Sequence, residues 1–258
     1  MRNIRLKNQD QFQALRESGR RLASVMETVS MALRPGISTG KLDSIAEAKI
    51  LELGGIPIFK GYGAEYGSPF PASICISLND EVVHGVPQPN RIVRDGDLVK
   101  LDMGLRFDGM VTDMARTFLV GTGNDLTQSL LRITCESLDQ GIAQIVSGKS
   151  LADYGGAVQK HVESHGFSIV RDLAGHGVGF ELHEPPEILN YQTKLGRQIL
   201  FEAGMAIALE PIVNAGHYSI ELASDDTTYV TSDHSLSAHF EDTVLITTEG
   251  IEIVTRPS

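Results

Sequence analysis

The sequence has no tryptophan, only two cysteines and no long hydrophobic run. Cys75 and Cys135 could form at most one disulfide, which argues against a disulfide-stabilised secreted scaffold. No stretch approaches the ~18 consecutive apolar residues of a membrane-spanning helix, and the start of the chain lacks the apolar segment of a signal peptide. We therefore expect a cytoplasmic protein that does not bind membranes.

Basic residues are also scarce: 22 Lys and Arg stand against 33 Asp and Glu, for a net charge of -11. Such a charge repels phosphate backbones, so direct nucleic-acid binding is not expected. With 258 residues, 41% of them hydrophobic, the chain is long enough to bury a substantial core. No Pro-, Ser- or Gly-rich linker divides it, so we expect one domain over residues 1–258.

Hydrophobic periodicity predicts helices and strands in an order that occurs twice. Helical patterns cover residues 9–35, 41–53, 131–145 and 151–164. Strand-like runs at 72–83, 97–105 and 110–120 follow the first helix pair, and further strands follow the second. We therefore predict an α+β protein of two pseudo-equivalent halves, at about 9–120 and 124–255.

Four acidic residues occupy matching places in these two halves. An apolar strand ends at Asp102 in the first half and at Glu210 in the second. Asp113 and Glu241 each lie where a later apolar strand begins. If the halves pack about a pseudo-twofold axis, the four carboxylates meet at one point.

The dipeptide Asp108-Gly109 predicts a two-residue hairpin turn and so fixes a strand register. Counting outward from the turn places Asp102 opposite Ala115. Asp113 then lies on the same face of the sheet as Asp102, as its diagonal neighbour about 7–8 Å away at the backbone. One cation could contact both carboxylates.

Converging carboxylates call for bound cations, because each like-charged pair 4 Å apart costs on the order of 4 kcal/mol at an effective dielectric of ~20. His176, between two glycines, could add an imidazole ligand. Oxygen ligands with an imidazole suit Mn, Fe, Co or Zn, and two divalent ions would neutralise four carboxylates. Taken singly, each acid is better explained as a solvated strand residue, and His176 as a satisfied core histidine. Together they favour a metal site.

The remaining histidines and the cysteines carry weaker signals. His84 and His183 lie in segments interrupted by glycine or proline and are ambiguous individually. Five further histidines belong to no recognisable constellation and are interpreted as surface or structural residues: His161, His165, His217, His234 and His239. Cys75 and Cys135 are interpreted as small apolar residues.

An ordered series of motifs resembles the type I methionine aminopeptidases, which have the pita-bread fold. The motifs are Phe70-Pro71-Ala72-Ser73-Ile74-Cys75, Asn79-Asp80-Glu81-Val82-Val83-His84-Gly85, Asp102, Asp113, Gly175-His176-Gly177, His183-Glu184, Glu210-Pro211 and Ser237-Ala238-His239-Phe240-Glu241. The resemblance extends from about residue 8 to 255 and implies a minimal, bacterial-type form. It also implies two halves whose antiparallel sheets are covered by helices.

The resemblance further implies a hydrolase that removes the initiator methionine when the second residue is small. Its substrates would be the N-termini of nascent polypeptides, including those still at the ribosome. The resemblance also implies a monomer. Five residues would bind two divalent ions of Mn, Co, Fe or Zn: Asp102, Asp113, His176, Glu210 and Glu241. Glu210 would also move the proton, His183 would contact the developing oxyanion, and His84 the scissile-bond region. The methionine pocket would comprise Tyr62, Phe70, Cys75 and Leu182, together with His84 and His183.

Two departures and three alternatives accompany this resemblance. Residues 63–69 form an insertion, which would change the rim of the pocket next to Tyr62. Thr227 lies near a position where relatives often carry tryptophan, and looser methionine selectivity would follow from that replacement. Residues 177–186 are also similar to Xaa-Pro aminopeptidases and dipeptidases, which usually carry a large preceding domain. A non-catalytic pita-bread binding protein would typically have lost metal ligands. A metal-stabilised structural protein would leave His84 and His183 unexplained.

Overall fold

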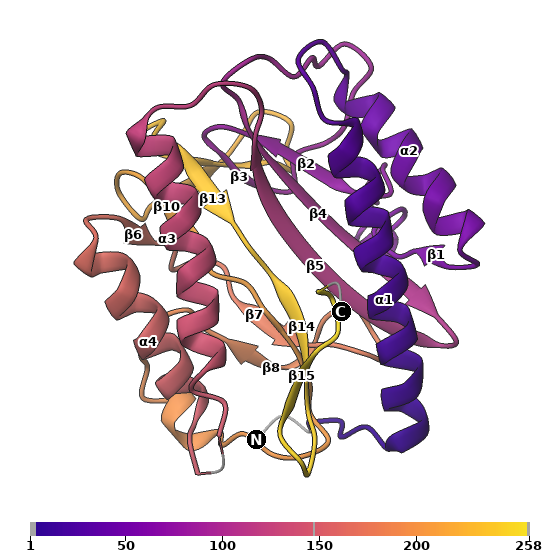
Figure 1. The fold of residues 1–258 in the computed structure, drawn as a ribbon, viewed down its shortest axis with the longest axis vertical. Coiled ribbons are helices and arrows are strands. Elements are labelled where there is room, and N and C mark those ends of the chain that lie inside the picture. The colour runs from indigo at the N-terminus through magenta and orange to yellow at the C-terminus, as the bar shows by residue number, and fades with distance from the viewer. Residues whose placement is uncertain (1–3, 147, 257–258) are drawn as a thin grey trace.

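A computed structural model describes residues 4–146 and 148–256. The helices flank a set of antiparallel sheets, with α1 and α2 on one side and α3 and α4 on the other (Figure 1). Their bounds are Gln9–Ala32 for α1, Thr39–Glu52 for α2, Asp125–Ile142 for α3 and Leu151–Ser164 for α4. All four predicted helices are confirmed, with ends that differ by a few residues.

Side-chain caps explain where these helices begin. Asn8 and Gln11 form a capping box at the start of α1, and Ser150 and Asp153 form one at the start of α4. Ser38 caps α2 and Asn124 caps α3. The apolar faces of the helices then pack on the sheets, because helix stability in proteins comes mainly from such burial.

The strands form four sheets. The first contains β1 (Ile56–Pro57), β4 (Leu98–Phe107), β2 (Cys75–Leu78) and β5 (Met110–Leu119). The second contains β15 (Ile251–Ile253), β14 (Asp242–Ile246), β9 (Ala206–Leu209), β7 (Gly175–Gly177) and β8 (Glu184–Ile188). Two smaller sheets contain β13 (Ser237–His239), β10 (Ile212–Asn214) and β6 (Ser168–Ile169), and β11 (Ile220–Leu222), β12 (Tyr229–Thr231) and β3 (Glu81–Val83). Two 3-10 turns complete the order, η1 (Ala64–Tyr66) and η2 (Gly196–Gln198).

The β4–β5 hairpin has the predicted register. Asp108 and Gly109 both adopt positive φ, as a tight hairpin turn requires, and Asp102 pairs with Ala115. The predicted strand 72–83 is wrong in one respect, because a turn at Asn79 divides it into β2 and β3. Asn79 has a φ of 53°, which an extended strand cannot contain.

The two larger sheets meet along β5 and the segment that leads into β14. Ala115 and Glu241 exchange backbone hydrogen bonds there. On one side of this pair, the Thr243 hydroxyl bonds to both the backbone N–H and the carbonyl of Asp113. On the other side, the Thr117 hydroxyl donates to the His239 carbonyl and accepts from the His239 N–H. We call these three pairs the seam.

Among the described residues, the hydrophobic core has two large clusters between the helices and the sheets, and a third in which Met110 and Val111 pack with Ala206 and Leu245 across the seam. One large cluster packs α1 and α2 on β4, around Leu22, Leu42 and Leu101. The other large cluster packs α3 and α4 on β9 and β14, around Ile133 and Val244. Within the described part of the chain, no helix is both long and apolar enough to cross a membrane.

Candidate active site

A cavity of about 500 Å³ brings together all the residues that the sequence singled out for chemistry. They are Tyr62, Phe70, Cys75, His84, Asp102, Asp113, His176, Leu182, His183, Glu210 and Glu241. The β4–β5 hairpin supplies Asp102 and Asp113, whereas His176 and Glu241 come from the sheet on the other side of the seam. The predicted convergence of acids from distant parts of the chain is therefore observed.

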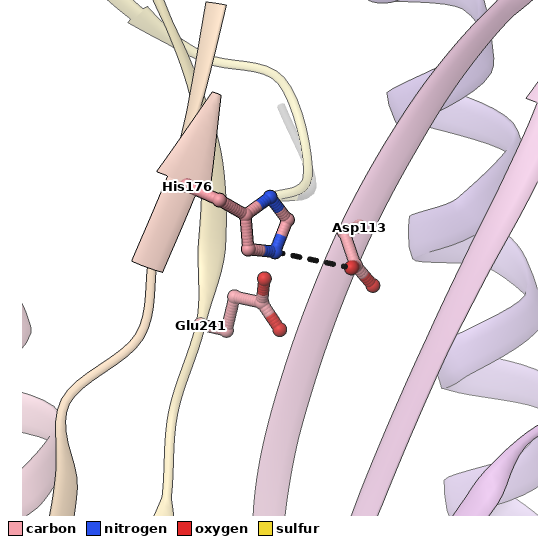
Figure 2. Close-up of side chains that lie close together, drawn as sticks. All are labelled: Asp113, His176 and Glu241. Atoms are coloured by element: carbon pink, nitrogen blue, oxygen red, sulfur yellow. Dashed lines mark ion pairs between the residues drawn. The ribbon is translucent and has the colours of Figure 1, made fainter. Parts of the chain in front are cut away.

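Three of these side chains form a compact cluster of ligand atoms (Figure 2). Asp113 on β5, His176 on β7 and Glu241 beside β14 each direct one ligand atom to within 4.8 Å of the others. All three residues are buried. An oxygen–nitrogen set with this spacing is suited to a divalent transition metal.

Asp102 and Glu210 complete the polar part of the cavity. Oε1 of Glu210 lies 3.4 Å from Nε2 of His176. Asp102 lies close enough to Asp113 for its charge to raise the Asp113 pKa. Both residues are partly buried: Asp102 lies within β4, between β2 and β5, and Glu210 directly follows β9.

Burial raises the pKa of Asp102 to about 7. Burial, followed by repulsion from neighbouring carboxylates, raises the pKa values of Asp113, Glu210 and Glu241 well above their ordinary range. Among the described residues, Oδ1 of Asp113 and Oε1 of Glu241 are buried without a hydrogen-bond partner. Cations at this position would both satisfy these oxygens and favour the ionised carboxylates, so the residues fit a metal site.

His176 has the tautomer that a metal ligand needs. Its Nδ1 lies 3.0 Å from the Gly177 carbonyl, which can only accept, so Nδ1 carries the proton. Burial lowers the pKa of His176 to about 4, which keeps the ring neutral at pH 7. Nε2 therefore presents a lone pair toward Asp113 and Glu210, at 3.9 and 3.4 Å.

His84 and His183 line the same cavity from two further segments. His84 follows β3 with a φ of 59°, a conformation that non-glycine residues rarely adopt and that is enriched at functional sites. The His183 ring packs edge-on against His176, with centroids 4.4 Å apart. Loss of contact with water, and then the nearby rings of His176 and His84, lower the pKa of His183, so this ring is also neutral at pH 7.

Residues 63–69, the predicted insertion, leave Tyr62 in the cavity. Backbone hydrogen bonds from Gly61 to Phe70 and from Phe70 to Tyr62 close the insertion at its base. The extra residues therefore project as a loop, and the two aromatic residues stay adjacent. Gly63, Ser68 and Pro69 of the insertion border the cavity, as does Thr227.

His239 is a site residue that the sequence interpretation missed. We expected a surface or structural histidine, but its ring is buried in the cavity wall, with Nε2 3.8 Å from Glu210 and 3.9 Å from Glu241. Neither ring nitrogen has a hydrogen-bond partner among the described residues. Burial, and then the nearby cations Lys100 and Arg116 together with His84, lower its pKa to about 3. The signal was available, since His239 lies two residues before Glu241, on the same face of an extended segment.

The other four histidines of that group lie outside the cavity. His161 is half-buried beside Glu136, with Nε2 3.2 Å from the carboxylate, whereas His165, His217 and His234 are exposed. Cys135 lies on α3, and Cys75 is buried in the cavity wall, where burial raises the pKa of its thiol. Both cysteines are free.

A match to one known family accounts for this arrangement of side chains. A model of metallopeptidase family M24 matches residues 13–248. The chain belongs to metallopeptidase family M24. Its predicted fold class is thereby confirmed, since members of known structure have the same architecture over nearly the whole chain.

Several M24 relatives are methionine aminopeptidases. That of Clostridium acetobutylicum is 40% identical over 252 residues, which are 98% of each protein. Methionine aminopeptidase 1 of Bacillus subtilis is 42% identical over 94% of this chain and 95% of its own length. The crystal structure of methionine aminopeptidase from Thermotoga maritima matches with a TM-score of 0.94 at 36% identity, over 99% of this chain and 100% of that one.

Proline-specific M24 enzymes share the architecture at lower similarity. The prolidase of Pyrococcus furiosus has a TM-score of 0.77 at 20% identity, and the match covers 98% of this chain and 66% of that one. At this identity the likeness shows the fold alone.

Proposed function

We propose that this protein is a dinuclear metal-dependent methionine aminopeptidase that removes the initiator methionine from polypeptides whose second residue is small. One observation carries the proposal. Asp113, His176 and Glu241 converge with Asp102 and Glu210 in a single cavity that also has an apolar wall. The methionine aminopeptidases among its relatives, 37 to 43% identical over at least 93% of this chain, support the same activity.

Asp102, Asp113, His176, Glu210 and Glu241 would hold two divalent ions of Mn, Co, Fe or Zn. Bound there, such ions would supply Lewis-acid chemistry, which would acidify a water molecule, hold the free amino group of the substrate and polarise the scissile carbonyl. Four carboxylates with raised pKa values supply the charge that two divalent ions neutralise.

Three side chains would act directly on the substrate. Glu210 takes a proton from the attacking water and delivers it to the leaving amine. His183 donates a hydrogen bond to the oxygen on which negative charge develops, and His84 contacts the scissile-bond region.

The methionine side chain would pack against Tyr62, Phe70, Cys75 and Leu182. Cys75 and Leu182 are buried and Phe70 is partly buried, so this wall can remove a thioether side chain from water. We infer a monomeric, cytoplasmic enzyme that acts on the N-termini of new polypeptides, including those that emerge from the ribosome.

Peptide hydrolysis by the purified protein tests this function. The protein is stripped with a chelator, dialysed, and supplied with Mn²⁺, Co²⁺, Fe²⁺ or Zn²⁺ before Met-Ala-Ser or Met-Gly-Ser is added. We expect metal-dependent release of methionine and little release from Met-Leu-Ser or Leu-Ala-Ser. Metal content per chain, measured on the active form, tests the two-ion stoichiometry.

The alternatives predict different products. An Xaa-Pro aminopeptidase or dipeptidase would cleave Ala-Pro or Ala-Pro-Ala and leave Met-Ala-Ser intact. A non-catalytic binding protein would cleave neither substrate with any of the four ions. Either result would overturn the proposal.

A further inference from the structure

The hydroxyl of Tyr62 lies 2.5 Å from Nδ1 of His183. The Tyr62 ring also packs edge-on against the His183 ring, with centroids 5.2 Å apart. The two residues are separated by 121 positions in the chain, so the loop that follows β1 contacts the segment before β8 here. Tyr62 therefore contacts a proposed catalytic residue as well as the proposed methionine pocket.

Backbone hydrogen bonds fix the position of this phenol. The Tyr62 N–H donates to the Phe59 carbonyl, and the Tyr62 carbonyl accepts from Phe70. The insertion is thus anchored at Tyr62 on one side and Phe70 on the other. An exposed tyrosine would otherwise sample several rotamers, and this anchoring favours the one that meets His183.

The contact bears on which nitrogen of His183 carries the proton. A neutral imidazole has one N–H and one lone pair, and the bond made by one nitrogen decides the role of the other. The phenol can donate to Nδ1 or accept from it. The first arrangement is favoured, because a phenol O–H is a stronger acid than a neutral imidazole N–H and an imidazole lone pair is a stronger base than a phenol oxygen. Nδ1 then supplies the lone pair, and the proton is on Nε2, the nitrogen that faces away from Tyr62.

The adjacent His176 has the opposite arrangement. The Gly177 carbonyl holds the proton of His176 on Nδ1 and leaves its Nε2 bare. The centroids of the two rings lie 4.4 Å apart. Two neighbouring imidazoles in one cavity therefore carry their protons on different nitrogens. His176 presents a lone pair, as a metal ligand must, whereas His183 presents an N–H, as a donor to a carbonyl oxygen must.

We propose that Tyr62 is a positioning residue, whose hydroxyl holds His183 in the Nε2–H tautomer so that His183 donates to the substrate carbonyl. The role in turnover rests on the proposed function, whereas the tautomer of His183 does not. Tyr62→Phe removes one oxygen atom and keeps the apolar ring, so it separates this role from that of a pocket wall.

Nitrogen NMR on ¹⁵N-labelled protein tests the tautomer at one neutral pH. The side-chain ¹⁵N shifts of His183, assigned by their loss in His183→Asn, are recorded for the metal-free protein and for protein loaded with diamagnetic Zn²⁺. We expect the Nε2–H pattern in the wild type and a shift toward a mixture of tautomers in Tyr62→Phe. Glu65→Gln, an exposed change on the same insertion, is the matched control and should leave the pattern unchanged.

Kinetics on Met-Ala-Ser provides the second readout. A lost hydrogen bond at a partly exposed site should reduce kcat about three- to tenfold, with KM changed less than twofold or so. The proposal is overturned by an Nδ1–H pattern in the wild type, by shifts that Tyr62→Phe leaves unchanged, or by a rise in KM alone. If the wild type releases no methionine, the proposed function fails, and the NMR result still decides the tautomer.

Discussion

Nζ of Lys7 lies 2.8 Å from Oε2 of Glu184, and each side chain is only 2% exposed. The other carboxylate oxygen of Glu184 accepts the backbone N–H groups of Phe180 and Glu181. The loop that carries Leu182 and His183 is therefore folded around one carboxylate. The segment before α1 supplies the countercharge that this buried carboxylate needs.

Replacing Lys7 should reveal the cost of leaving that carboxylate unpaired. We expect Lys7→Met to lower the free energy of unfolding in urea by about 3–5 kcal/mol, because a buried charge loses its partner. The double variant Lys7→Met with Glu184→Gln should be less destabilised, since it buries no unpaired charge. Lys49→Met, which breaks the partly exposed pair with Glu52, is the control and should cost under about 1 kcal/mol. Equal effects of Lys7→Met and Lys49→Met would contradict this assignment.

Glu210→Gln should remove the proposed proton carrier. We expect kcat on Met-Ala-Ser to fall about 10²–10⁴-fold, because general acid–base groups contribute that much. The far-ultraviolet circular dichroism should stay unchanged. Glu202→Gln, an exposed change shortly before β9, should keep normal turnover. A kcat within threefold or so of the wild type would remove Glu210 from the mechanism.

His239 should influence the metal site without belonging to the proposed ligand set. Its Nε2 lies within 4 Å of Glu210 and Glu241, close enough to orient both carboxylates after a small adjustment. We expect His239→Leu to weaken Mn²⁺ binding, measured by calorimetry, about 10- to 100-fold, as loss of a group that supports metal ligands does. His161→Leu, on α4, should bind Mn²⁺ normally. Unchanged Mn²⁺ affinity in His239→Leu would show that its burial is only structural.

Metal ions should stabilise the protein more as the pH rises. Carboxyl groups whose pKa is higher in the folded than in the unfolded state stabilise the metal-free fold at low pH, and this stabilisation is lost as the pH rises through the folded pKa. Burial raises the pKa of Asp102 to about 7, and the other three acids are also raised, so the loss extends from about pH 4 to above pH 7. Metal binding needs the ionised carboxylates, so the stabilisation by metal grows over the same range.

Urea unfolding with Mn²⁺ or with chelator, at pH 5, 6 and 7, measures this stabilisation. We expect the difference in unfolding free energy to rise by about 1.4 kcal/mol per pH unit for each proton that metal displaces. Subtracting the two conditions cancels groups that titrate equally with and without metal. Asp113→Asn, which removes one of the titrating groups, should flatten the slope. A difference that does not depend on pH would mean that the carboxyl groups are ionised without metal.

The sequence was most informative where a local rule sets a long-range register. Asp108-Gly109 fixes a two-residue turn, and the turn fixes every pair of the β4–β5 hairpin, including Asp102 with Ala115. The placement of Asp102 and Asp113 on one face followed from alternation alone. The division into two related halves remains a prediction.

The contacts that the sequence could not predict join segments that no local rule relates. Tyr62 and His183 meet because the 63–69 insertion closes at its base and leaves Tyr62 in place. The pair between Lys7 and Glu184 connects positions 177 residues apart. His239 differs, since its spacing from Glu241 within the motif at 237–241 contained the information.

The seam has a consequence for how the protein would lose its metal. Ala115 and Glu241 exchange backbone hydrogen bonds across it, and the hydroxyl groups of Thr243 and Thr117 bond on either side. Arg116 adds an ion pair with Asp242 across the seam. Asp113 and Glu241, two proposed ligands, stand on opposite sides of the seam. Separating them would also break the hydrophobic cluster in which Met110 and Val111 of β5 pack with Ala206 and Leu245. Amide deuterium uptake at Ala115 and Glu241 would report such an opening, and with it release of the ions.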